Sequence, residues 1–253
     1  MRIAVITGAS SGLGVEFLME TVKQFPELDK IWLIARRMDR LEKLSSMYSH
    51  PKCVPLPMDL SSEESYQELE RLLNEKSAEV RLLINNAGFG KLGNLVDSEL
   101  HSQMSMVDLN CRGLTAMTCV CLKHMSRGAC IVNTCSIASF APNPRLTVYS
   151  ATKAYVLSFT KSLREELKPL GIGCTCVCPG PMKTEFLEVA LITPGSSSTF
   201  DTLPYCDPAI VAKKTLIAAR KGRCVYTNKF FYKLYRVIAK VVPHSLVMKI
   251  SKA

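Results

Sequence analysis

A glycine-rich turn near the N-terminus constrains the fold of this chain more than any other part of its sequence. The run Ile-Ala-Val-Ile at 3–6 leads directly into the turn Thr-Gly-Ala-Ser-Ser-Gly-Leu-Gly at 7–14, and a helical pattern follows over 15–24. A strand, a glycine turn and a helix N-terminus in this order form an anion site, because backbone N–H groups and the helix dipole point at a phosphate. This context is typical of the first unit of a dinucleotide-binding domain. The turn residues expected to contact the cofactor are Gly8, Ser10, Ser11, Gly12, Leu13 and Gly14. Gly14 would also let the helix pack closely on the sheet.

The second predicted strand, 31–35, ends in two arginines, Arg36 and Arg37. An acidic residue at this place would bind the ribose 2′-hydroxyl of NAD. An arginine instead suits a 2′-phosphate, through its charge and its paired hydrogen-bond donors. The sequence therefore predicts NADP(H), with Arg36 the better candidate than Arg37. The alternative is that both arginines only face water.

The next two strands, 53–58 and 82–85, also end in polar or small residues. Asp59, followed by Leu60, could accept a hydrogen bond from the adenine amino group or cap the helix 63–76, a role for which Ser61 and Ser62 compete. After the fourth strand come Asn86, Ala87 and Gly88. A doubly wound sheet reverses direction at its fourth strand, so these residues are expected to line the cofactor.

Asn110 lies in the middle of a helical pattern over 102–125, in apolar surroundings. A buried polar side chain costs stability unless it is hydrogen-bonded. A kinked helix in which Asn110 or a freed carbonyl holds a water is one explanation. A buried asparagine bonded to a neighbouring loop is the other, and the residue by itself favours this second explanation.

Candidate catalytic residues follow the fifth strand, 129–133. Ser136 comes just after the carboxyl end of this strand, where its hydroxyl could donate to a substrate carbonyl; Ser139 is a nearby rival, and a plain turn serine is the alternative. Tyr149 and Lys153 are four apart on a helix and share one face. An adjacent ammonium favours the phenolate and is expected to lower the tyrosine pKa, which makes Tyr149 a proton donor or acceptor near neutral pH.

The sixth strand, 173–178, ends in a rigid turn with Pro179 and Gly180, expected on the nicotinamide side. Thr184 could touch the carboxamide or the pyrophosphate. The irregular segment 185–208 is expected to act as a lid that sets substrate choice, since long loops in compact domains are usually functional. Its apolar residues indicate a hydrophobic substrate: Phe186, Leu187, Val189, Leu191, Ile192 and Phe200.

A helix over 208–221 and a strand over 224–227 complete a predicted catalytic domain of residues 1–228. The remaining tail, 229–253, mixes aromatic and aliphatic residues with lysines and arginines. It could pack over the mouth of the active site as part of the lid, form a subunit contact, or lie on a membrane surface. For this tail, packing over the active site as part of the lid is favoured over contact with a membrane.

Composition excludes several classes of protein. The sequence has no run of 18 uncharged apolar residues, so no transmembrane helix is expected. The eleven cysteines lie mostly in apolar runs, which indicates free thiols in a reduced, cytoplasmic protein with no metal site. The net charge of +10 is not accompanied by a nucleic-acid-binding motif.

Together these motifs resemble the short-chain dehydrogenase/reductase family over nearly the whole chain. The resemblance implies a Rossmann-type α/β fold, with one parallel sheet of seven strands in the order 3-2-1-4-5-6-7 and helices on both faces. It also implies that Tyr149 is the general acid/base and that Ser136 orients the substrate oxygen. Lys153 would lower the tyrosine pKa and bind the nicotinamide ribose, and Asn110 would hold a water in a proton relay. Members usually form dimers or tetramers.

The arginines after the second strand resemble those of the NADP-preferring branch, and the run 36–41 with the tail is similar to hydroxysteroid dehydrogenases and related ketone reductases. The expected activity is the NADP(H)-dependent interconversion of a ketone and a secondary alcohol, on an apolar, steroid-like or lipid-like substrate. Alternatives are a 3-oxoacyl reductase, a sugar-alcohol dehydrogenase, or a non-catalytic NADP-binding regulator.

Overall fold

Seven parallel strands form one sheet in the order β3-β2-β1-β4-β5-β6-β7, the predicted order. The structure, a computed structural model, describes residues 1–250, with the side chains of 249 and 250 left out. The strands are β1 (Arg2–Thr7), β2 (Lys30–Ala35), β3 (Lys52–Pro57), β4 (Glu79–Asn85), β5 (Cys130–Thr134), β6 (Gly173–Val177) and β7 (Val225–Tyr226).

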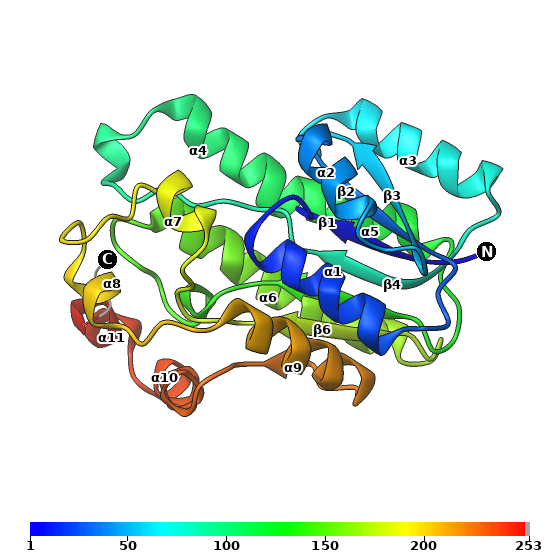
Figure 1. The fold of residues 1–253 in the computed structure, drawn as a ribbon. Coiled ribbons are helices and arrows are strands. Elements are labelled where there is room, and N and C mark those ends of the chain that lie inside the picture. The colour runs from blue at the N-terminus through cyan, green and yellow to red at the C-terminus, as the bar shows by residue number, and fades with distance from the viewer. Residues whose placement is uncertain (251–253) are drawn as a thin grey trace.

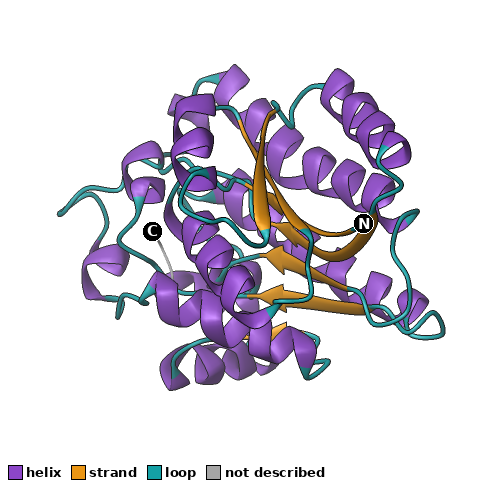
Figure 2. Cartoon of the chain, turned by 45° about the vertical axis from the view of Figure 1, so that its right-hand side comes forward, coloured by secondary structure: helices purple, strands orange, loops and turns teal. Residues whose placement is uncertain are grey.

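Helices cover both faces of this sheet (Figure 2). Side chains of α1 (Gly12–Gln24), α2 (Met38–Ser45) and α9 (Pro208–Arg220) share one hydrophobic cluster with the strands. A second cluster contains side chains of α3 (Glu63–Glu75), α5 (Leu114–Leu122) and α6 (Thr147–Leu167). The sheet is therefore the middle of three layers.

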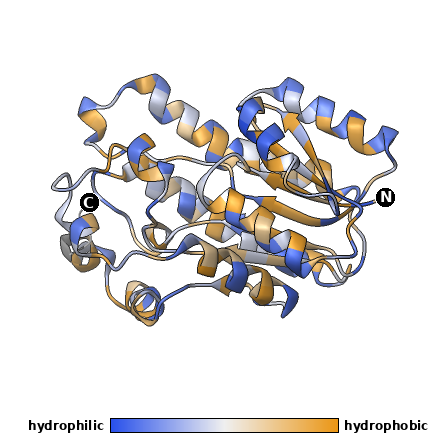
Figure 3. Ribbon diagram, in the orientation of Figure 1, coloured by the Kyte–Doolittle hydropathy of each residue, from blue (hydrophilic) through white to orange (hydrophobic). Residues whose placement is uncertain are grey.

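The first strand shows why the chain folds in this way. Ala4 and Ile6 belong to the first cluster and Ile3 and Val5 to the second, so the alternation of a strand sends neighbouring side chains to opposite faces. All four are fully buried. Strands covered on both faces need continuous apolar runs, as the orange strands of Figure 3 show. Burying each larger aliphatic side chain contributes about 1.5–3 kcal/mol.

The parallel strands bring all their carboxyl ends to one edge of the sheet. The chain order reverses between β1 and β4, which opens a crevice at that edge. The short helices α7 (Glu185–Val189) and α8 (Ser198–Thr202) and the last helix, α11 (His244–Ile250), lie at the end of the molecule away from the N-terminus (Figure 1). The predicted lid therefore contains two short helices, where the sequence pattern indicated only irregular chain.

The helical pattern expected over 102–125 is helical from 100 to 122, with an irregular turn around Asn110. The structure divides it into α4 (Leu100–Val107), a π-helical segment η2 (Asp108–Gly113) and α5. The π-helical segment contains Asn110, whose side chain bonds to a neighbouring loop. π-Helical turns inside α-helices are rare and often occur at functional sites.

The tail also forms helices, α10 (Phe230–Val241) and α11. Residues 251–253 of the predicted tail, with Lys252, lie outside the described residues. Among the helices of residues 1–250, none has the length and apolar character needed to cross a bilayer.

Candidate active site

A cavity of about 760 Å³ opens at the carboxyl edge of the sheet. Apart from Asn110, it brings together residues from the motifs identified in the sequence, from Gly8 to Thr184, which are 176 positions apart (184 − 8). Gly14 and Asn110 are the two predicted site residues that do not line it. The predicted residues that do are Gly8, Ser10, Ser11, Gly12, Leu13, Arg36, Arg37, Asp59, Leu60, Asn86, Ala87, Gly88, Ser136, Tyr149, Lys153, Pro179, Gly180 and Thr184.

One end of the cavity is the glycine turn before α1. Gly8 and Gly12 adopt left-handed backbone conformations, with φ of +64° and +52°. A Cβ at Gly14 would lie 2.0 Å from the carbonyl oxygen of Gly8, so this position allows the close packing of helix and strand rather than ligand contact. Ser11, the N-cap of α1, makes no side-chain capping hydrogen bond, and the first turn of α1 carries no acidic residue. These features fit a bound pyrophosphate, which would be held by the N–H groups of this turn.

The two predicted arginines differ in their partners. Arg36 is exposed at the cavity rim. Arg37 donates to Ser10 Oγ over 3.1 and 3.3 Å and to Glu185 Oε2 over 2.9 Å. Arg40 also pairs with Glu185. Hydrogen bonds from Arg40 and Arg37 lower the pKa of Glu185 to about 2, so its carboxylate is a fixed anion beside the arginines.

Asp59 takes part in a local turn. Its Oδ1 accepts hydrogen bonds from Ser61 N at 2.9 Å and Ser61 Oγ at 2.7 Å. Burial is the largest single effect and raises the pKa of Asp59, but the two hydrogen bonds and the charge of Arg36 together lower it. Ser62 is the N-cap of α3, although its side chain makes no capping bond. Asp59 thus lies at the cavity without being the helix cap, and its contact with adenine stays a prediction.

The candidate catalytic residues lie at the centre of the cavity. Tyr149 and Lys153, on α6, are both buried. Ser136 lies after β5, and its Oγ accepts a hydrogen bond from Ala138 N at 3.1 Å. Lys153 Nζ donates to the carbonyl oxygen of Thr134 over 2.9 Å and lies 5.7 Å from the Tyr149 ring centroid.

The expected lowering of the Tyr149 pKa is wrong for this structure. Burial raises the pKa of Tyr149, and its interaction with the Ser136 side chain only partly opposes this shift. Lys153 does not offset this rise in the tyrosine pKa, because its ammonium donates to a backbone carbonyl. Burial also lowers the pKa of Lys153 itself. Tyr149 is therefore a protonated phenol at neutral pH, a form that can donate a proton.

Asn110 links three elements behind the cavity. Its Nδ2 donates to the carbonyl oxygen of Phe89 over 2.9 Å and to Thr152 Oγ1 over 3.1 Å, and its Oδ1 accepts from Phe89 N at 3.1 Å. The expectation of a buried asparagine bonded to a loop is confirmed. Its role in a proton relay stays a prediction.

The far end of the cavity is apolar. Phe186 of the lid segment lies against Tyr149, with ring centroids 5.6 Å apart. Of the predicted lid residues, Leu191 and Ile192 do not line the cavity. The lining residues here are Phe186, Leu187, Val189, Thr199, Phe200 and Leu203 from the lid segment and Phe231, Tyr232 and Tyr235 from α10.

Tyr232 and Glu185 are site residues that the sequence did not indicate. Tyr232 is fully buried, its hydroxyl donates to the carbonyl oxygen of Pro204 over 2.8 Å, and its ring packs against Gly180. One side of the tail thus packs over the site, as favoured from the sequence. No local pattern distinguishes Tyr232 from the other aromatic residues of the tail, or Glu185 from an ordinary helix-start carboxylate.

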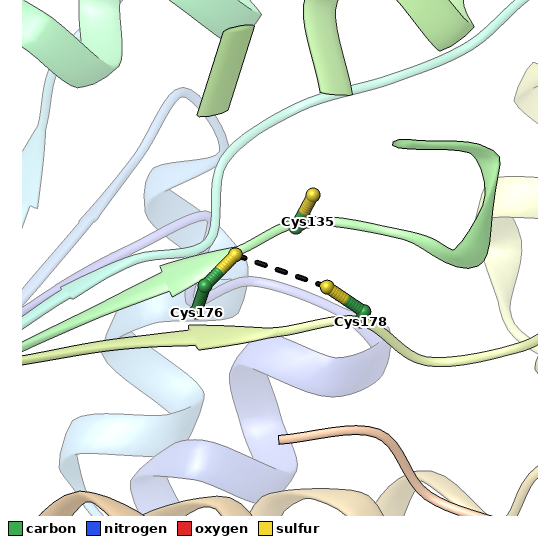
Figure 4. A group of neighbouring side chains, drawn as sticks. All are labelled: Cys135, Cys176 and Cys178. Atoms are coloured by element: carbon green, nitrogen blue, oxygen red, sulfur yellow. Dashed lines mark hydrogen bonds between the residues drawn. The ribbon is translucent and has the colours of Figure 1, made fainter. Parts of the chain in front are cut away.

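Three cysteines beside the site form a compact group (Figure 4). The sulfur atoms of Cys135, Cys176 and Cys178 all lie within 4.8 Å of one another, and all three residues are buried. Burial raises the pKa of Cys176 and Cys178, so both stay neutral thiols that pack as small apolar groups. All eleven cysteines of the chain are free.

Comparison with known proteins agrees with this fold and site. The family model for short chain dehydrogenases matches residues 2–192, and the chain belongs to this family. The chain is 34% identical to sulfoacetaldehyde reductase 2 of Chromohalobacter salexigens over 79% of this chain and 80% of that protein.

Two solved structures at 25% identity share the fold. A short-chain dehydrogenase from Sphingobium yanoikuyae in complex with NADPH has a TM-score of 0.81 and covers 100% of this chain and 97% of its own. The bulky-bulky ketone specific alcohol dehydrogenase from Comamonas testosteroni has a TM-score of 0.77. The match covers 98% of this chain and 94% of that chain. The protein is thus an oxidoreductase of a family whose members bind nicotinamide cofactors.

Proposed function

We propose that this oxidoreductase uses NADP(H) to interconvert a bulky apolar ketone and its secondary alcohol. The observation that carries the proposal is the position of Tyr149. It lies within one cavity between a glycine-turn end suited to phosphate and an apolar end lined by the lid segment and α10.

Tyr149 and its neighbours have different roles toward the substrate oxygen. In reduction, the protonated Tyr149 hydroxyl gives its proton to that oxygen, while the Ser136 hydroxyl holds the oxygen in place. The ammonium of Lys153 donates to the carbonyl oxygen of Thr134 and would also bind the nicotinamide ribose. Bound NADP(H) would supply or accept the hydride.

The preference for NADP(H) rests on local charge. Arg36 and Arg37 both line the cavity, with Arg40 beside them, and Ser10 lies within hydrogen-bond distance of Arg37. An arginine cluster is complementary to a 2′-phosphate. The similar Sphingobium enzyme is described with NADPH, which supports the same choice here.

The substrate class rests on the apolar end of the cavity. Aromatic and aliphatic side chains from two separate segments enclose it, which suits a large hydrophobic ketone. The Comamonas enzyme described as bulky-bulky ketone specific supports this choice. A 3-oxoacyl thioester is the second candidate, whereas a sugar alcohol fits the apolar lining poorly. The free cysteines suit a cytoplasmic place of action.

The test is oxidation of NADPH and of NADH across ketosteroids, oxoacyl thioesters and small ketones. We expect turnover of a bulky apolar ketone with NADPH, and a selective rise of the KM for NADPH when Arg36 and Arg37 are replaced by alanine. Equal turnover with NADPH and NADH would contradict the preference for NADP(H) but not the proposed reaction. Tight binding of NADPH without turnover of any ketone would favour the NADP-binding regulator.

A further inference from the structure

The helix α10 has two different faces. Tyr232 and Ala239 face inward and are buried. On the outer side, Phe230 is 80% exposed, Val237 57% and Val241 79%. With the exposed Leu234, these residues follow a spacing of four, three and four, which places them in one stripe along the helix. An outward stripe of four large apolar side chains is unusual for a protein surface that meets only water.

The charge of the chain is concentrated in the same region. Residues 208–253 contain eight lysines and three arginines and no acidic residue. The other 207 residues hold the remaining 21 basic residues and all 22 acidic ones, so they are nearly neutral. The net charge of +10 therefore belongs to residues 208–253, which include α10.

Lysines of α10 lie beside the apolar stripe. Lys233 and Lys240 are both exposed and, at 100° per residue, point to one flank of it. Lys229, the N-cap of the helix, falls on the same flank. An exposed apolar stripe bordered by cations is the pattern of helices that lie in the plane of a membrane surface.

We propose that the outer face of α10 docks on an anionic lipid surface, with the apolar stripe inserted at the headgroup boundary and the lysines on the phosphates. A second copy of this chain is a poorer occupant, because a twofold contact through this face would bring its uncompensated cations together. The inner side of α10 lines the cavity through Phe231, Tyr232 and Tyr235, so docking would bring the cavity mouth close to the bilayer.

The experiment is flotation of the full chain with vesicles. One set contains equal parts phosphatidylglycerol and phosphatidylcholine, and the other contains phosphatidylcholine alone. We expect flotation with the anionic vesicles only, weakening as salt is raised, because surface charges are screened.

The apolar stripe is tested by Val237→Ser combined with Val241→Ser. Both side chains point outward, so the fold should be kept while partition falls about tenfold. The matched control is the double variant Val96→Ser with Leu100→Ser. Val96 is 90% exposed and Leu100 is 76% exposed, and neither residue belongs to α10. The control should float like the wild type.

Three outcomes would overturn the proposal: no flotation with anionic vesicles, equal flotation with both vesicle types, or flotation unchanged in the stripe variant. A dimer that depends on Val237 and Val241, in the absence of vesicle binding, would assign the stripe to self-association. Because flotation needs no ketone, none of these results bears on the proposed activity.

Discussion

At the scale of single residues, burial decides the chemistry of Tyr149. The phenol is surrounded by protein, and the nearest cation, Lys153, is tied to the carbonyl oxygen of Thr134. The proton therefore stays on the hydroxyl at neutral pH, which suits donation to a developing alkoxide. Helical spacing predicts that the two residues share a face, but it does not say where the ammonium points.

Replacing Tyr149 by phenylalanine removes the proposed proton donor without altering the apolar contacts of the ring. We expect kcat for ketone reduction to fall by about 10²–10⁴, the usual contribution of general acid catalysis. NADPH binding, followed by fluorescence titration, should be unchanged. Full turnover by the variant would exclude Tyr149 as the general acid.

The raised pKa of Tyr149 also predicts a pH dependence. Reduction needs the protonated phenol, so its kcat should be flat around neutral pH. Alcohol oxidation needs the phenolate, which forms only above the ordinary tyrosine value of about 10, so its rate should keep rising with pH. Initial rates in both directions over the same buffers test this. An oxidation rate that levels off near neutral pH would show that the phenol pKa is lowered in the working enzyme.

At the scale of elements, the site depends on contacts between segments that are distant in the sequence. The lid segment reaches α2 through Glu185, which pairs with Arg37 and Arg40. The tail reaches the turn after β6 through Tyr232 and Gly180. Both contacts attach a peripheral segment to the elements that border the cavity.

The Glu185 carboxylate should compete with a cofactor phosphate for the arginines. In Glu185→Gln, the KM for NADPH should fall about two- to fivefold, the range expected for partly exposed ion pairs, while the KM for NADH stays constant. Glu188→Gln, an exposed position on the same helix, is the matched control. An equal change for both cofactors would show that Glu185 acts only on the lid.

The contact between Gly180 and Tyr232 leaves no room for a side chain. A Cβ at Gly180 would lie 2.2 Å from Cε2 of the Tyr232 ring, so Gly180→Ala should destabilise the fold by about 1–3 kcal/mol. Urea unfolding measures the loss. The same substitution in a Tyr232→Leu background should cost less, and an unchanged cost would place the strain elsewhere.

At the scale of the whole molecule, stability resides in the two helical layers packed on the sheet. Leu216 of α9 is fully buried in the first cluster, whereas its neighbour Ile217 is partly exposed. Leu216→Ala should lower the free energy of unfolding by about 2–5 kcal/mol through the cavity it leaves. Ile217→Ala should cost clearly less in the same urea titration. Similar losses for both would mean that α9 does not pack as described.

Most of the fold could be predicted from the sequence, because buried parallel strands leave an apolar signature. The run at 3–6 and the glycine turn at 7–14 specify a strand, a turn and a helix through local physics alone. The sequence allowed a kink at Asn110 but did not identify the partners of this side chain, because Phe89 and Thr152 are 21 and 42 positions away.

The sequence by itself determined the order of strands and helices and the candidate residues at their ends, since periodicity and turn chemistry are local properties. Only the tertiary structure decided the environment of those residues. Burial raises the pKa of Tyr149 although a lysine is four residues away, Glu185 pairs with Arg37 and Arg40, and Tyr232 closes one side of the cavity. Desolvation and ion pairing depend on every neighbour in space, and a local sequence pattern holds only a few of those neighbours.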